Sequence, residues 1–371
     1  MMRSAHFVVL VSMMLGAAAP GLGRATPAPP LPPCVPASAD VTVAALGAIL
    51  AGQGDYHVRR CAALDLAARG AAAVPVVVGT LGSRDSDTVK FALNALSKMG
   101  PQAQAALPAL MDWIRTPSPA LQENDLALYD AVGAIGAGAR PAIPLLIVRS
   151  RDPRHRFSAV EALGVLGKYD AARVVPHLAS ILESQKGEGG LLEAQHTLDA
   201  IRKIGKQARA ALPATLASLE EASEAFDWMH GGAAVRTLVA IAEPSESIPV
   251  LTELLHHPML ARRAVDGLAL MGPAAAGAVP ALIHKLDHSR EQPLLAGMIV
   301  SALADIAPQS AVVQQKLLVE ATQHQTEWAA FALSRIGPLP SHFAPALAAA
   351  LAKKPGDFFL SKALENTRRA K

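Results

Sequence analysis

Residues Ala95–Ile114 read ALSKMGPQAQAALPALMDWI, and a phrase of this form recurs along most of the chain. An apolar stretch ends in Ala-Leu-x-x-x-Gly, a short turn follows, and the next stretch opens with a proline and continues with leucines. Glycine permits the left-handed backbone that closes a helix, and proline fits a first helical turn because its missing N–H has no partner there. The phrase therefore predicts two helices joined by a short turn.

The phrase recurs with a regular spacing. Nine turn positions follow one another 30 to 38 residues apart, at Gly70, Gly100, Gly136, Gly167, Gly205, Ala242, Gly272, Ala307 and Gly337. In seven of the nine copies a proline follows seven to nine residues later. This period is the length of one helical hairpin, and a single hairpin cannot bury its apolar face. The sequence therefore predicts stacked hairpins that share one core.

The composition supports helices packed on helices. Hydrophobic residues make up 51% of the 371-residue chain, yet aromatic residues make up only 4%, so alanine, leucine and valine dominate. Alanine and leucine rank highest in helix propensity, whereas sheets are richer in β-branched and aromatic residues.

The repeat resembles HEAT repeats, and is most similar to the bacterial subtype called phycobilisome-lyase HEAT-like repeats. The resemblance covers about residues 40–371 and implies an all-α fold, a right-handed α-solenoid of about nine helical hairpins. Such repeats occur in scaffolds, inhibitors and a few enzymes, so the resemblance implies no single activity.

The N-terminus predicts export. Residues 1–25 have the form of a signal peptide, with Arg3 before a 13-residue apolar segment at Phe7–Ala19 and cleavage near Gly23 or Ala25. A Pro-rich linker, residues 26–38, precedes the solenoid at 39–371, which ends in a capping helix. We expect a periplasmic or secreted protein with no membrane span in its mature chain.

Export also bears on the charge and on the two cysteines. Removal of Arg3 and Arg24 leaves 32 Lys and Arg against 31 Asp and Glu, a net charge of +1, which gives no electrostatic reason to bind nucleic acid. In an oxidising compartment a cysteine pair usually bridges, so we predict a disulfide between Cys34 and Cys61, worth roughly 3 kcal/mol. The alternative is a buried Cys61 and a free Cys34 thiol.

Motifs for catalysis are missing from the sequence. It contains no His-Glu-x-x-His, Cys-x-x-Cys or Gly-x-Ser-x-Gly, and none of its 12 histidines precedes a glutamate. HEAT-like deoxyhypusine hydroxylases carry their di-iron site on His-Glu dipeptides, so that activity is not expected. Phycobilin lyases act inside the cell, which conflicts with export. We therefore predict no catalytic residues and no cofactor.

One set of residues has the chemistry of a zinc site. Glu253 and His257 follow Pro249 by four and eight residues, and His284 and His288 follow Pro280 in the same way. If the second helix of each hairpin lines the concave surface, these side chains share an exposed face and form a ligand set suited to Zn²⁺. Solvated helix ends are the alternative explanation.

The same register places five further residues on or near the concave side, where they would contact a partner: Asp112, Trp113, Arg149, His177 and Lys285. An exposed tryptophan among mixed charges is typical of a protein-binding hot spot, although Trp113 would serve equally well at the edge of the core. We therefore expect a non-enzymatic scaffold that binds a protein or peptide in a concave groove, with its oligomeric state open. The alternatives are a metal-dependent or lyase-like enzyme, and an inhibitor or immunity protein for an exported toxin.

Overall fold

The computed structural model describes residues 32–38, 40–116, 123–185, 191–224, 228–324 and 326–368. The predicted signal peptide lies outside these ranges, and linker residues 32–38 form neither helix nor strand. The chain divides into two units, Met1–Val35 and Pro36–Lys371. All helices described below belong to the second unit.

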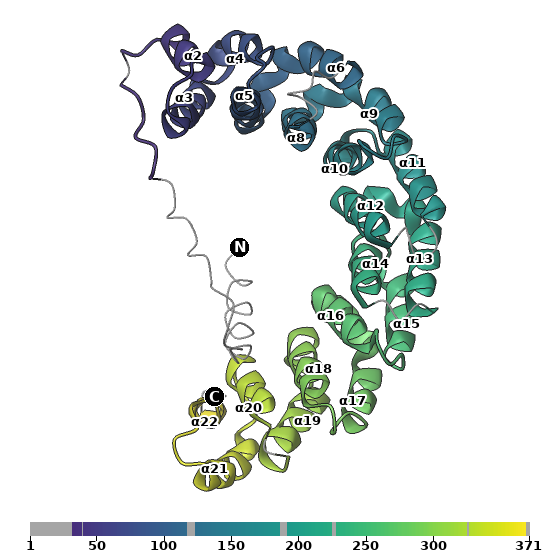
Figure 1. Ribbon diagram of the computed structural model, residues 1–371. Coiled ribbons are helices and arrows are strands. Elements are labelled where there is room, and N and C mark those ends of the chain that lie inside the picture. Colours follow the sequence, from purple (N-terminus) through teal and green to yellow (C-terminus); the bar gives the residue numbers. More distant parts are fainter. Residues whose placement is uncertain are drawn as a thin grey trace, which may run out of the picture. The chain divides into compact units, whose positions relative to one another are not determined.

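The second unit consists of two rows of helices that follow a curve (Figure 1). The inner row contains α3 (Tyr56–Ala68), α5 (Ser86–Met99), α8 (Asp125–Ile135), α10 (Arg156–Leu166), α12 (Leu191–Ile204), α14 (Trp228–Ile241), α16 (Ala261–Met271), α18 (Pro293–Ile306), α20 (Glu327–Arg335) and α22 (Phe358–Arg368). The outer row contains α2 (Val43–Ala51), α4 (Val74–Thr80), α6 (Leu107–Arg115), α9 (Ile143–Arg149), α11 (Ala171–Ser184), α13 (Leu212–Glu224), α15 (Pro244–Leu254), α17 (Val279–Asp287), α19 (Ala311–Thr322) and α21 (Ala344–Lys353). Within the described ranges there is no strand, so the predicted all-α solenoid is confirmed.

The helices pair differently from the sequence prediction. Each outer-row helix packs against the inner-row helix that follows it in the chain, as α4 does against α5 and α13 against α14. The predicted turns therefore lie between successive pairs rather than within them. Nine turns separate ten pairs in the described part of the chain, one more than the nine hairpins expected. Contacts between pairs run along the inner row, from α5 to α8 and from α10 to α12, so each pair is held by its neighbours.

The turns contain the predicted glycine conformation. Positive φ values from 56° to 92° occur at Gly70, Gly100, Gly136, Gly205, Gly272 and Gly337. Most turns continue as a short 3₁₀ segment, such as Gly100–Ala106, before the outer-row helix begins. Proline then occupies the first or second helical position in most outer-row helices, including Pro108 in α6 and Pro280 in α17.

Two prolines depart from this pattern. Pro176 and Pro249 are the sixth residues of α11 and α15 rather than the first or second. In both cases the preceding 3₁₀ segment is short or missing, because those residues already belong to the helix. The expectation that proline marks the first turn is wrong at these two positions.

Neighbouring pairs pack most closely along the inner row. A Cβ atom at Gly164 of α10 would lie 2.7 Å from the Cα atom of Ala200 in α12, and one at Gly267 of α16 would lie 2.7 Å from the Val235 side chain in α14. Neighbouring inner-row helices therefore approach very closely at these glycines. Because the contacts between pairs are concentrated on this row, it is the shorter row and forms the inside of the curve.

Two stretches of the solenoid are long and apolar enough to cross a membrane by length and composition alone, Asp125–Arg149 and Ala261–Asp287. Each consists of an inner-row helix, a 3₁₀ segment and an outer-row helix, with Gly136 or Gly272 at positive φ between them. The buried core residues of both stretches, such as Val132 and Leu268, belong to the one hydrophobic core of the stack.

Candidate interaction surface

The residues predicted to line the concave side lie on the outer row instead. Asp112 and Trp113 belong to α6, Arg149 ends α9, His177 lies in α11 and Lys285 in α17, and all four helices run along the outer side of the curve (Figure 1). That placement is therefore wrong. The physical reason is the close packing at inner-row glycines, which involves neighbouring repeats and is invisible in the pattern of one repeat.

Several of these side chains have structural contacts. Asp112 forms an exposed ion pair with Arg115 at 2.6 Å, while Trp113 is half-buried and packs against the core. His177 Nε2 lies 2.7 Å from the hydroxyl of Ser150. Burial, and secondarily Arg151, lowers the pKa of His177. Whether any of them contacts a partner stays a prediction.

The inner-row surface has its own register. On each inner-row helix the residues two, six and ten positions before the turn share a face, because residues four apart lie one above the other. On the nine described inner-row helices that precede a turn, the middle position is exposed or partly exposed. Its residues are Leu64, Asn94, Asp130, Glu161, Asp199, Arg236, Asp266, Ser301 and Phe331. The position nearest the turn is likewise exposed or partly exposed throughout, from Ala68 to Arg335. The outer row and the flanking helices cover the other sides, so this face points to the inside of the curve.

Charges divide this surface into segments. Three successive middle positions, on α8, α10 and α12, are the acids Asp130, Glu161 and Asp199. Burial raises the pKa of Asp130, and the neighbouring Glu161 raises it further, while Lys203 acts in the opposite direction. Lys203 forms an ion pair with Glu161 across the two helices. The acidic segment is thus only partly neutralised.

The next segment is basic. Arg236 and Arg262 are exposed on α14 and α16, and Arg263 pairs with Asp266 at 3.3 Å. Burial raises the pKa of Asp266, while Arg263 and Arg236 lower it. The inner row therefore presents acidic and then basic side chains from α8 to α16.

The C-terminal end of the inner row is aromatic, although only 4% of the chain is aromatic. We call this region the aromatic patch; it consists of Trp328, Phe331, Phe358 and Phe359 from α20 and α22, together with Arg335. Phe331 and Phe359 pack edge to face with ring centres 5.1 Å apart, and the Arg335 guanidinium lies 5.5 Å from the Phe331 ring centre. Trp328 is 41% exposed and Phe358 is 71% exposed. Exposed aromatic rings beside an arginine are typical of binding hot spots.

The predicted capping helix accounts for part of this patch. We expected a polar helix at the C-terminus, and α22 does close the stack, with Leu360 and Ala363 buried against it. However, its first turn presents Phe358 and Phe359, which lie just before the polar tail. A polar cap alone does not explain a 71% exposed phenylalanine.

A small pocket with apolar, polar and charged walls lies between α10 and α12. Phe157 contacts His196 edge to face, with ring centres 4.5 Å apart, and Arg156 pairs with Glu193 at 2.8 Å. These four residues line a pocket whose other walls are Pro153, Val160, Gln185 and Thr197. The pocket thus combines the ring of Phe157 with an ion pair and polar side chains.

The predicted zinc ligands do not converge. Among the described residues, no group of ligand atoms within 4.8 Å of one another contains Glu253, His257, His284 or His288. His257 has a structural role instead. Its Nδ1 accepts the backbone amides of Met259 and Leu260, at 3.2 and 3.1 Å, and its Nε2 donates to the Ser223 carbonyl at 3.1 Å. Both ring nitrogens are occupied, so His257 is excluded from the predicted ligand set.

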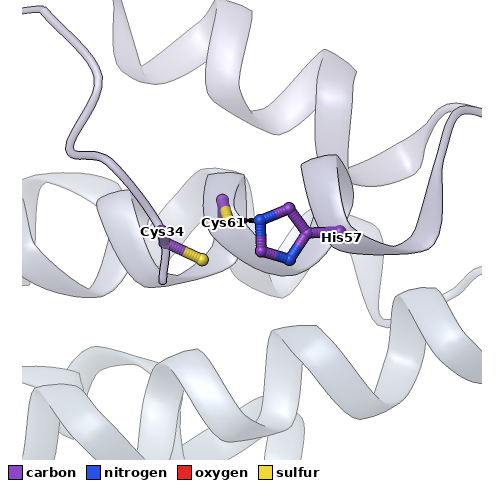
Figure 2. Close-up of side chains that lie close together, drawn as sticks. All are labelled: Cys34, His57 and Cys61. Carbon is purple, nitrogen blue, oxygen red and sulfur yellow. Dashed lines mark hydrogen bonds between the residues drawn. The ribbon is translucent and has the colours of Figure 1, made fainter. Parts of the chain in front are cut away.

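The two cysteines, Cys34 and Cys61, are both disulfide-bonded. Figure 2 draws Cys61 and His57, one turn apart on α3, together with Cys34. His57 Nε2 lies 3.4 Å from Cys61 Sγ. A cysteine–histidine pair requires a thiolate for catalysis or metal binding. With its sulfur in a disulfide, Cys61 offers none.

The comparisons with known proteins agree with the solenoid fold. Residues 43–128 match the family described as HEAT repeats. The phycobilisome-lyase subtype remains an expectation of the resemblance. No curated protein matches the chain.

Two solved structures are similar in fold. Yeast importin-β (Kap95p) aligns over 86% of this chain and 51% of its own, with 12% identity and a TM-score of 0.55. The karyopherin Kap121p, bound to the extreme C-terminus of the protein phosphatase Cdc14p, aligns over 90% of this chain and 42% of its own, with 14% identity and a TM-score of 0.53. The chain thus spans about half the length of these proteins or less.

Sequence reasoning missed the inner-row surface and the aromatic patch. The signal for the inner-row surface was present, because counting back two and six residues from each turn yields positions that are exposed or partly exposed. Trp328 and Phe358 lie outside the recurring phrase, so the repeat pattern did not single them out.

Proposed function

We propose that this protein is a non-enzymatic, extracytoplasmic scaffold that binds a protein or peptide along its inner-row surface. The observation that carries the proposal is the aromatic patch, where Trp328 and Phe358 are exposed in a chain that otherwise has few aromatic residues. Tryptophan and arginine are enriched among residues that dominate binding energy, and Arg335 of the same patch lies over the Phe331 ring. The predicted signal peptide supports a location outside the cytoplasm.

The charge segments favour a partner that extends along the row. Its apolar side chains would occupy the aromatic patch, basic side chains would face Asp130 and Asp199, and acidic ones would face Arg236 and Arg262. A row of packed helices is formed before binding, so ordering the surface costs little free energy. The similar fold of Kap121p, which binds the C-terminal segment of a phosphatase, supports this mode of recognition.

The experiment is affinity capture from the extracytoplasmic fraction with variants of the two rows. Trp328→Ala and Phe358→Ala test the inner row, and Trp113→Ala and Arg149→Glu are the matched controls on the outer row. We expect the inner-row variants to lose a partner that the outer-row variants retain. The reverse pattern would show that the surface lies on the outer row, and retention by all four variants would contradict both assignments.

The location is tested separately. We expect N-terminal sequencing of the protein recovered from the extracytoplasmic fraction to begin at Arg24 or Thr26, which corresponds to cleavage after Gly23 or Ala25. A protein that remains in the cytoplasm with Met1 in place would contradict export, and it would leave the test of the inner-row surface unaffected.

A further inference from the structure

Three exposed histidines gather on the outer row, away from the inner-row surface. His284 is in the last turn of α17 and His288 directly follows that helix, while His256 lies two residues beyond the end of α15. The ring centres of His284 and His288 are 4.3 Å apart, and those of His256 and His284 are 6.5 Å apart. The helices α15 and α17 are neighbours in the outer row (Figure 1).

We propose that His256, His284 and His288 form a surface site for a divalent transition-metal ion such as Zn²⁺. Imidazole nitrogen is the donor that zinc and copper ions accept readily, and the site is independent of the proposed protein binding. It retains two of the four ligands predicted from the sequence. His256 takes the place of His257, whose ring nitrogens are used by the backbone, and Glu253 is left out.

The three rings lie close together but do not converge on one point in the structure. The His284 and His288 rings are 4.3 Å apart and inclined by only 32°, and among the described residues no three ligand atoms of this group lie within 4.8 Å of one another. Bonds of about 2.0–2.1 Å to one ion therefore require these exposed side chains to rotate. His256 is farther away at 6.5 Å, but its side chain is exposed at the surface, so a rotation about its side-chain bonds brings it to the ion without disturbing the core.

One hydrogen bond orients a ligand in advance. His288 Nδ1 donates to the backbone carbonyl of His284 at 2.8 Å. This bond fixes the tautomer and leaves the Nε2 lone pair of His288 for the ion, which is the usual arrangement of a metal-binding histidine. The carbonyl groups at the C-terminal end of α17 also favour a cation there.

The nearby acid is already engaged. Asp287 pairs with Lys316 of α19 at 2.6 Å, and with Arg290 at 3.9 Å. The ligand set is therefore three imidazole nitrogens, a set that zinc completes with water.

The test is isothermal titration of the full mature chain with Zn²⁺ at pH 7.5, without thiol reductant so that the disulfide stays intact. We expect one ion per chain, with the affinity reduced at least tenfold in each of His284→Ala and His288→Ala and about tenfold in His256→Ala. Circular dichroism of each variant checks that it folds, which removal of an exposed histidine permits.

Two control variants address other sites. His342→Ala removes an exposed histidine elsewhere, and His57→Ala removes the one beside Cys61; both should bind Zn²⁺ as the unaltered chain does. Heat that persists unchanged in the His284→Ala, His288→Ala double variant overturns the proposal, as does the lack of any binding by the folded chain at 0.1 mM Zn²⁺. An unchanged affinity in His256→Ala overturns the three-ligand site.

Discussion

Trp328 lies against Gly297, its neighbour on the adjacent inner-row helix. A Cβ atom at Gly297 would be 2.8 to 2.9 Å from the Cδ1, Cγ and Nε1 atoms of the Trp328 ring. Such a distance is too short for van der Waals contact, so only glycine allows the indole to lie on the backbone of α18. This contact holds the Trp328 indole of the aromatic patch in place.

The first prediction follows from this contact. Gly297→Ala should push the Trp328 ring away from α18 and expose more of it to water. We expect the tryptophan fluorescence of the variant to shift to longer wavelength and to be quenched more strongly by acrylamide. Its matched control is Gly277→Ala, where a Cβ would meet nothing within 4 Å. Equal quenching of both variants would contradict the contact.

The second prediction concerns the close packing that curves the inner row. Gly164→Ala should lower the free energy of unfolding by about 1–3 kcal/mol, because the added methyl group would strike the backbone of α12 at Ala200. Gly79→Ala, on the outer-row helix α4, has open space around it and should be neutral or slightly stabilising. Urea unfolding of both variants measures the difference, and similar stabilities would refute the role of Gly164.

The third prediction is a dependence of stability on pH. Asp85 caps α5, accepts the Thr88 hydroxyl at 2.6 Å and the Thr88 amide at 2.8 Å, and forms an ion pair with the largely buried Arg59. Hydrogen bonds from Thr88, reinforced by Arg59 and opposed by burial, lower the pKa of Asp85 to about 2.

An unfolded aspartate has a pKa of about 3.9, so the folded state binds this proton less readily. The stabilisation is therefore fully present above about pH 5 and is lost as the pH falls toward 2. Asp85→Asn should be less stable than the unaltered chain at pH 7, with the gap in the free energy of unfolding narrowing by pH 2.5. A gap that stays constant over this range would rule out Asp85 as the source.

The fourth prediction separates His257 from the histidines of the proposed metal site. His257→Ala removes the acceptor of two backbone amides, including that of the buried Leu260. We expect it to cost about 1–2 kcal/mol of stability, while His288→Ala, at an exposed position, should change stability little. Thermal unfolding of the two variants side by side gives the comparison; if they unfold alike, His257 has no structural role.

The sequence predicted the elements well but not their arrangement. The phrase at Ala95–Ile114 correctly places a helix, a glycine turn and a proline-led helix, because these features depend on residues close in the chain. Which row lies inside the curve depends on contacts between neighbouring repeats, such as that of Gly164 with Ala200. The sequence of one repeat does not contain this information. The predicted concave residues on α6 and α17 were misplaced for this reason.

Prediction of the candidate sites from the sequence was limited in the same way. The pattern selected His257 by its spacing from Pro249, although its ring is used by the backbone at the start of α16. His256, one residue earlier, points its ring toward α17 closely enough to lie 6.5 Å from His284. Two successive residues at a helix end point their side chains in different directions. The spacing from Pro249 therefore does not determine which of the two histidines faces α17.

The contacts between neighbouring pairs have a consequence for how such a chain can change length. Duplication of one helix pair by recombination would add one more contact between neighbouring pairs and leave the contacts between the other pairs intact. It would add one inner helix with the two positions, two and six residues before the turn, that are exposed or partly exposed in every repeat, so the surface would lengthen by one helix. New side chains at those positions could then be selected without disturbing the core. The surface of the inner row could therefore change one helix at a time.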